Sequence, residues 1–124
     1  MAQSVSDGIV LYTKHETQQS LTNRPLITAI SHDKWSGCAQ AIGTTAWNNV
    51  HGLSYHTYQT SLSGIQSDLN SLYSTYGKPI WVTEIADGSG SSMAANQQLM
   101  TQFVQWAASR TWIERIFWNQ AVRV

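Results

Sequence analysis

A single carboxylate lies inside a strongly apolar stretch of this chain. The stretch reads KPIWVTEIA over residues 78–86, and Glu84 follows the apolar residues Ile80 to Val82. Charged residues are among those least often fully buried, so a glutamate in this position is a candidate for a function. An ionised carboxylate at this point could act as a nucleophile in covalent catalysis.

Three further side chains with useful chemistry lie late in the neighbouring predicted strands. VHGLSYHTY (50–58) alternates as strands do, and its His56 and Tyr58 are two residues apart, so they share one face. Trp118 takes a similarly late position in the last predicted strand. Because functional groups of α/β proteins gather at the carboxyl ends of strands, these residues and Glu84 predict a polar and aromatic site there. The alternative is a salt-bridged Glu84 beside a helix, with the aromatic rings in the core.

The elements that would hold these residues alternate along the second half of the chain. Apolar spacing predicts strands at 50–58, 78–86 and 112–124, separated by helices at 63–77 and 92–110. This order is typical of a parallel α/β sheet. Ser63 followed by Gln66 predicts a capping box at the start of the first helix, and Gly77 predicts its end.

The first half of the chain has weaker patterns. RPLITAIS (24–31) reads as a strand, and DGIVLYTKHE (7–16) is a candidate for another. Residues 33–49 are small, polar and interrupted by tryptophan, which indicates either a long loop or an irregular helix. No linker or internal repeat divides the chain, so one domain over 1–124 is predicted.

Composition excludes several classes of function. Seven basic residues balance seven acidic ones, so there is no field that would attract nucleic acid or an anionic membrane. His51 and His56 are five apart and face opposite ways on a strand, so they cannot share a metal, and a zinc site is not expected. Cys38 is the single cysteine, a nucleophile or a small buried residue. The start, MAQSVSDG, has no signal-peptide pattern.

Three motifs together resemble the C-terminal half of clan A glycoside hydrolases, which are (β/α)8 barrels. They are GLSYHTY, YGKPIWVTEIA and IERIFWNQ, in the order and at the intervals of that group. The chain looks closest to fungal and bacterial β-glucanase-like catalytic domains of the alkali-sensitive-linkage-protein type. The resemblance covers residues 24–120, is strongest from residue 50 onward, and leaves 1–23 poorly matched. It implies a half TIM barrel that corresponds to strands five to eight.

The resemblance also implies an activity and a set of site residues. It implies retaining hydrolysis of a β-linked polysaccharide, such as a β-glucan, with Glu84 as the nucleophile and without metal or cofactor. The residues that it places at the substrate are His56, Tyr58, Trp81, Trp118 and Asn119, with the Trp118 ring as a platform under the sugar. Relatives are often secreted, so an extracellular location is implied although no signal peptide is visible.

One catalytic group of these relatives is missing from the sequence. They carry the acid/base glutamate after an asparagine, and no Asn-Glu pair occurs here. Glu16 is the nominated acid, but it follows His15 and lies too close to the 24–31 strand for the usual crossover helix. A solvated loop residue is the alternative for Glu16. Asp33 and Asp87 are further candidates, each with a turn residue as its alternative.

The length of the chain leaves three outcomes open. A (β/α)8 barrel takes about 250 residues, and this chain has 124. It is then a fragment of a longer enzyme, or a half that a second copy closes into a homodimeric barrel, or a compact α/β unit. The last would bind sugar without cutting it. Two alternatives to an enzyme follow: a carbohydrate-binding module that lacks the acid/base, and an assembly or interaction protein that uses the half-barrel as a dimerising scaffold.

Overall fold

A computed structural model describes most of the chain as two compact units. The described residues are 27–28, 32–90 and 92–119, and the units span 1–54 and 55–124. The candidate strand at 7–16 and the nominated acid Glu16 lie outside the described residues. The single domain over 1–124 stays a prediction.

The first unit contains a kinked helix. A 3₁₀ turn, η1 (His32–Lys34), leads into α2 (Trp35–Asn49). Gly43 interrupts α2 with φ 81° and ψ 168°, a backbone conformation that glycine adopts because it has no Cβ. Of the two alternatives for residues 33–49, the irregular helix is therefore confirmed.

The predicted strand at 24–31 is described only at its centre. Ile27 forms a parallel bridge with Gly52. Thr28 extends this pairing through its side chain, whose Oγ1 accepts a hydrogen bond from the Ser54 amide at 2.8 Å. The described part thus has the extended, parallel pairing that the pattern predicts.

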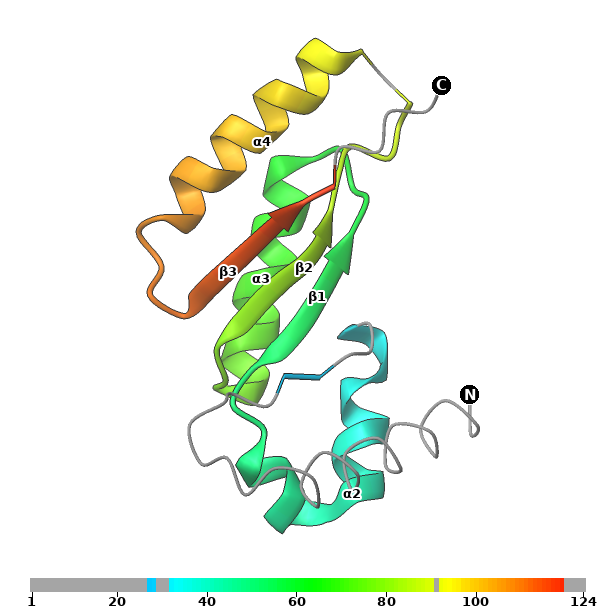
Figure 1. The fold of residues 1–124 in the computed structure, drawn as a ribbon, viewed down its shortest axis with the longest axis vertical. Helices are drawn as coiled ribbons and strands as arrows, with labels where there is room; N and C mark the ends of the chain where they lie inside the picture. The colour runs from blue at the N-terminus through cyan, green and yellow to red at the C-terminus, as the bar shows by residue number, and fades with distance from the viewer. Residues whose placement is uncertain (1–26, 29–31, 91, 120–124) are drawn as a thin grey trace. The chain divides into compact units, whose positions relative to one another are not determined.

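The strands and helices of the second half form one parallel α/β sheet. Its elements are β1 (Leu53–Thr57), α3 (Leu62–Tyr76), β2 (Ile80–Ile85), α4 (Met93–Ala107) and β3 (Ile113–Trp118). The strand order is β1-β2-β3, and the three arrows in Figure 1 run in the same direction. The predicted alternation is confirmed, and the open sheet of three parallel strands is consistent with a partial barrel.

The capping box predicted at Ser63 is wrong. Helix α3 begins two residues earlier, because Ser61 is extended and its Oγ accepts a hydrogen bond from the Gly64 amide at 3.2 Å. That bond satisfies one of the free N–H groups of the first turn. The predicted end is confirmed, since Gly77 takes a left-handed conformation and its amide donates to the Tyr73 carbonyl at 2.8 Å.

Buried positions along β2 are two and then three residues apart, and along α4 they recur every four residues. Ile80, Val82 and Ile85 of β2 are buried, and so are Leu99, Phe103 and Ala107 of α4. Val104, which the helical pattern also places on the buried side, is 44% exposed. At this position the helical pattern is not followed, and Val104 instead lines a groove between α4 and β3.

Two irregularities shift the pairing between β2 and β3. The paired residues are Ile80 with Ile113, Trp81 with Arg115, Val82 with Ile116, and Ile85 with Trp118. Glu114 is therefore an extra residue in β3, and β2 has an extra residue at Thr83–Glu84. Bulges of this kind re-aim side chains and are common beside active sites. Glu84 lies within one.

A buried tyrosine fixes β1 to α3. The Tyr55 hydroxyl donates to Asp68 Oδ2 at 3.2 Å, and the Gln59 amide nitrogen donates to the same oxygen. Tyr55 is fully buried, so its hydroxyl needs this acceptor. The network holds the turn after β1 against the helix, and that turn carries Tyr58.

Alkaline pH should destabilise the protein through Tyr55. Burial raises the pKa of Tyr55 to about 12 from its ordinary 10.0, and the charge of Asp68 acts in the same direction. The unfolded chain loses this proton first, so the stabilisation is complete below pH 10 and is lost as the pH rises toward 12. The expected loss is about 2–3 kcal/mol, from about 1.4 kcal/mol per pKa unit.

Urea unfolding between pH 9 and pH 12 measures this effect. Tyr55→Phe should be less stable at neutral pH, because Asp68 loses a hydrogen bond, but its free energy of unfolding should fall less steeply above pH 10. Equal slopes for the two proteins would mean that Tyr55 ionises as freely in the folded state as in the unfolded one.

Candidate active site

Three of the predicted site residues meet at the carboxyl ends of β1 and β2. The Tyr58 hydroxyl donates a hydrogen bond to Glu84 Oε2 at 3.0 Å. His56 Nε2 lies 3.8 Å from Glu84 Oε1, which is within ion-pair range when the imidazole is protonated. The two carboxylate oxygens of Glu84 therefore have different neighbours, a phenol and an imidazole.

The elements explain why these side chains converge. His56 lies in β1 and Tyr58 just after it, while Glu84 lies in the β2 bulge, and parallel neighbouring strands bring their carboxyl ends together. The Ala86 amide, just after β2, donates to the Thr57 carbonyl at 3.3 Å and joins the two ends. The Glu84 side chain is 48% exposed, so a ligand can reach it. A fixed, accessible anion of this kind suits attack on an electrophilic carbon.

Trp118 and Asn119 lie at the same carboxyl-terminal end of the sheet as Glu84. Trp118 ends β3 opposite Ile85, and the Asn119 amide donates to the Ile85 carbonyl at 2.9 Å. The buried Trp118 Nε1 and Thr83 Oγ1 have no hydrogen-bond partner among the described residues. The roles of Trp118 and Asn119 at a substrate stay predictions.

Trp81 lies farther from the Glu84 carboxylate along β2. It precedes Glu84 by three residues, roughly 10 Å along a strand. Its indole nitrogen donates to Glu114 Oε2 at 2.9 Å, and the Arg115 guanidinium lies 5.8 Å from its ring centroid. Substrate binding by Trp81 stays a prediction. Glu114 was missed because it reaches Trp81 through the β3 bulge, which strand periodicity does not reveal.

The other candidates for chemistry have local explanations. Asp87 is a turn residue, as its alternative predicted, because its Oδ1 accepts a hydrogen bond from the Ser89 amide at 2.9 Å. Burial raises the pKa of the Cys38 thiol, which opposes formation of a nucleophilic thiolate. Within the described residues, no three His, Cys, Asp or Glu side chains could together hold a metal ion.

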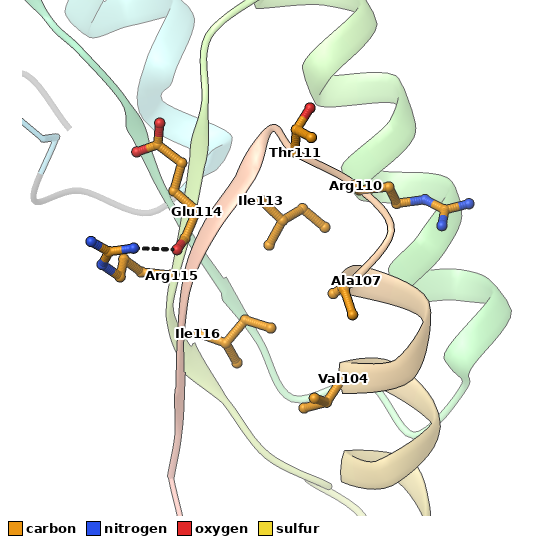
Figure 2. A pocket seen from close by; sticks show the side chains of 9 residues that line it. Val104, Ala107, Arg110, Thr111, Ile113, Glu114, Arg115 and Ile116 are labelled. Carbon is orange, nitrogen blue, oxygen red and sulfur yellow. Dashed lines mark hydrogen bonds between the residues drawn. The ribbon is translucent and has the colours of Figure 1, made fainter.

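A pocket in the second unit lies away from Glu84, between α4 and β3. It has a volume of about 280 Å³. Figure 2 shows Val104 and Ala107 of α4 and Ile113 and Ile116 of β3 around it. Five of its nine lining residues are apolar, and the other four are Arg110, Thr111, Glu114 and Arg115. Among the described residues, β3 is one of the two edge strands of the sheet. The pocket is a groove beside an open edge, not the candidate site.

Comparison with known families and structures gives a consistent result. A family model described as the glycosyl hydrolase catalytic core matches residues 35–124. The fold is similar to a GH128 (subgroup V) exo-β-1,3-glucanase from Cryptococcus neoformans, with a TM-score of 0.79 and 17% identity. It is also similar to a GH128 (subgroup I) endo-β-1,3-glucanase from Amycolatopsis mediterranei, with a TM-score of 0.66 and 20% identity. No curated protein matches the chain.

The coverage of these structures is one-sided. The likeness extends over 98% and 92% of this chain, but over 51% and 53% of the two glucanases. This chain therefore spans about half the length of each. At these identities the likeness concerns the fold, and it agrees with the partial barrel of Figure 1.

Proposed function

Because this chain belongs to the glycosyl hydrolase catalytic-core family, we propose that it hydrolyses a β-glucan by a retaining mechanism with Glu84 as the nucleophile. The observation that carries this proposal is the Glu84 carboxylate, held by Tyr58 at 3.0 Å and exposed at the carboxyl ends of the strands. The hydrogen bond fixes Oε2, and Oε1 remains for attack.

The reaction has two steps. Glu84 Oε1 forms a bond to the anomeric carbon while the glycosidic C–O bond breaks and the leaving oxygen takes a proton from an acid. Water then attacks the same carbon, gives its proton to the former acid and releases Glu84. The acid must lie about 5–5.5 Å from Glu84. Glu16 remains our nominee for it.

The two similar solved structures are β-1,3-glucanases, so β-1,3-glucan is the first substrate to test. We expect reducing-sugar release from β-1,3-glucan to exceed release from β-1,4-glucan, mannan and xylan. No release from any of them would favour the alternative, a carbohydrate-binding domain without the acid/base. Calorimetry with oligosaccharides of these glucans, mannan and xylan then tests that alternative. Binding that Glu84→Gln retains would establish it.

Tyr58→Phe should lower kcat by about 10- to 100-fold, because it removes a hydrogen bond to a charged group worth about 1.5–3 kcal/mol. Tyr58 is 48% exposed, so the free energy of unfolding should change by less than about 0.5 kcal/mol. Steady-state hydrolysis and urea unfolding of both proteins measure these effects. An unchanged kcat would mean that the phenol contributes nothing to the reaction.

We propose further that a second copy of the chain closes the barrel. Two observations support this: β3 is an edge strand of the sheet that the described residues form, and a groove with the exposed Val104 lies beside it (Figure 2). Light scattering should give twice the chain mass of 13.8 kDa. Val104→Glu, at an exposed position in the groove, should yield the monomer. A monomeric wild type would overturn this arrangement and leave a scaffold role without support.

A further inference from the structure

The loop after β2 is tied to the residue that holds Glu84. The Gly88 amide donates a hydrogen bond to the Tyr58 carbonyl at 3.0 Å. The loop itself is anchored on α4, because the Asp87 amide donates to Asn96 Oδ1 at 3.1 Å. Asn96 thus fixes the backbone from which Gly88 reaches Tyr58.

Gly88 approaches Tyr58 more closely than any other residue type could. A Cβ at position 88 would collide with the Tyr58 carbonyl oxygen and would lie 2.8 Å from the Tyr58 Cβ. The backbone conformation does not itself require glycine, since the glycines with positive φ are Gly43, Gly77 and Gly90. Close approach to Tyr58 is therefore the reason for glycine at this position.

A side chain at position 88 would displace the carbonyl group and the Cβ of Tyr58, and the Cβ carries the ring. The Tyr58 ring is 48% exposed, so packing holds it only in part, and its backbone must set where the hydroxyl lies. On the other side of Tyr58, Gln59 is bound to Asp68. The backbone of Tyr58 is thus held from both directions.

From these contacts we infer that Gly88 is a positioning residue, which places the Tyr58 hydroxyl on the Glu84 carboxylate through direct backbone contact. Its meaning for catalysis rests on the proposed role of Glu84 as the nucleophile. The geometric claim concerns the hydrogen bond alone and can be tested without any hydrolysis.

The test is carbon NMR of the full chain labelled at the tyrosine Cζ, with the Tyr58 resonance identified by its loss in Tyr58→Phe. In an otherwise wild-type chain, Glu84→Gln should shift this resonance, because the phenol loses a charged acceptor. In a chain that carries Gly88→Ala, adding Glu84→Gln should no longer shift the Tyr58 resonance. The matched control is Gly90→Ala, whose added Cβ meets nothing within 4 Å although φ is +70°. It strains the same loop without touching Tyr58, and it should keep the shift.

Each outcome bears on the inference. Loss of the shift in Gly88→Ala together with its retention in Gly90→Ala supports it. A shift that survives in Gly88→Ala, or that is absent from the wild-type background, overturns it. If Gly88→Ala does not fold, Asn96→Ala replaces it, because that variant releases the loop without adding atoms, and an undiminished shift there also overturns the inference.

The outcome for Gly88 is separate from that of the proposed function. A chain that releases no sugar but shows the Glu84-dependent shift keeps Gly88 as the residue that places Tyr58, while hydrolysis fails. A chain that hydrolyses β-glucan but shows no such shift keeps the function, while the role of Gly88 fails.

Discussion

Glu84→Gln should lower hydrolysis of β-1,3-glucan by at least about 1000-fold, because loss of a catalytic nucleophile costs more than loss of any supporting contact. The amide has almost the same size as the carboxylate and can still accept the Tyr58 hydrogen bond, so the fold should be preserved. What it lacks is the negative charge and nucleophilicity needed to form the glycosyl-enzyme ester. Reducing-sugar release and far-ultraviolet circular dichroism measure the two parts of this expectation.

The acid/base can be bypassed with an aryl β-glucoside whose phenolate leaves without protonation. A fluorinated analogue that slows the second step should leave one sugar on the wild-type chain, and peptide mass spectrometry should locate it on Glu84. Glu84→Gln should remain unlabelled. Labelling of another residue would show that the nucleophile lies elsewhere, whatever the hydrolysis rates.

Glu114→Gln is the matched control for this substitution. Glu114 undergoes the same chemical change, but it is the second residue of β3, away from the carboxyl ends of the strands. Its carboxylate accepts a hydrogen bond from Trp81 at 2.9 Å. The amide oxygen of this variant can still accept the bond from Trp81, so only the charge is lost and activity should stay within about tenfold of wild type. A loss as large as that of Glu84→Gln would mean that Glu114, too, takes part in the reaction.

The second large effect concerns stability. Phe103→Ala should lower the free energy of unfolding by about 3–5 kcal/mol, because the ring is fully buried and its removal leaves a cavity. The ring also lies beside Trp106, with the two centroids 6.0 Å apart. Urea denaturation at neutral pH measures the change.

Val104→Ala is the adjacent control on the same helix. Val104 is 44% exposed in the single chain, so in a monomer its truncation should change the free energy of unfolding by less than about 0.5 kcal/mol. In the dimer proposed above, where a second copy covers Val104, the loss should be larger. Equal losses for the two variants would mean that the Val104 side is covered in solution, as closure of the barrel by a second copy would require.

Much of the fold followed from the sequence because its cues are local. Alternating and helical spacing located β1, α3, β2, α4 and β3, and Gly77 marked a helix end. The start of α3 was misplaced at Ser63, because serines at 61 and 63 both fit a cap. Only the extended backbone at Ser61 separates them.

Side-chain exposure was less predictable than helical phase. Val104 has the spacing of a buried residue, yet it is 44% exposed and lines a groove beside β3, an edge strand of the sheet that the described residues form. Periodicity reports which side of a helix faces the protein, but it does not report where the neighbouring sheet stops. For the same reason, periodicity did not reveal the groove between α4 and β3 in Figure 2.

The sequence by itself determined the parallel α/β alternation, the family resemblance and the candidate site residues, among them His56, Tyr58 and Glu84. These rest on residue type and on spacing within single elements. Only the tertiary structure decided the pairing of Tyr58 with Glu84, the bulge that carries Glu84 and the contact of Gly88 with Tyr58. Tyr58 lies 26 residues before Glu84, so their separation in space depends on strand register, and a one-residue shift in register would send the side chains to the other face.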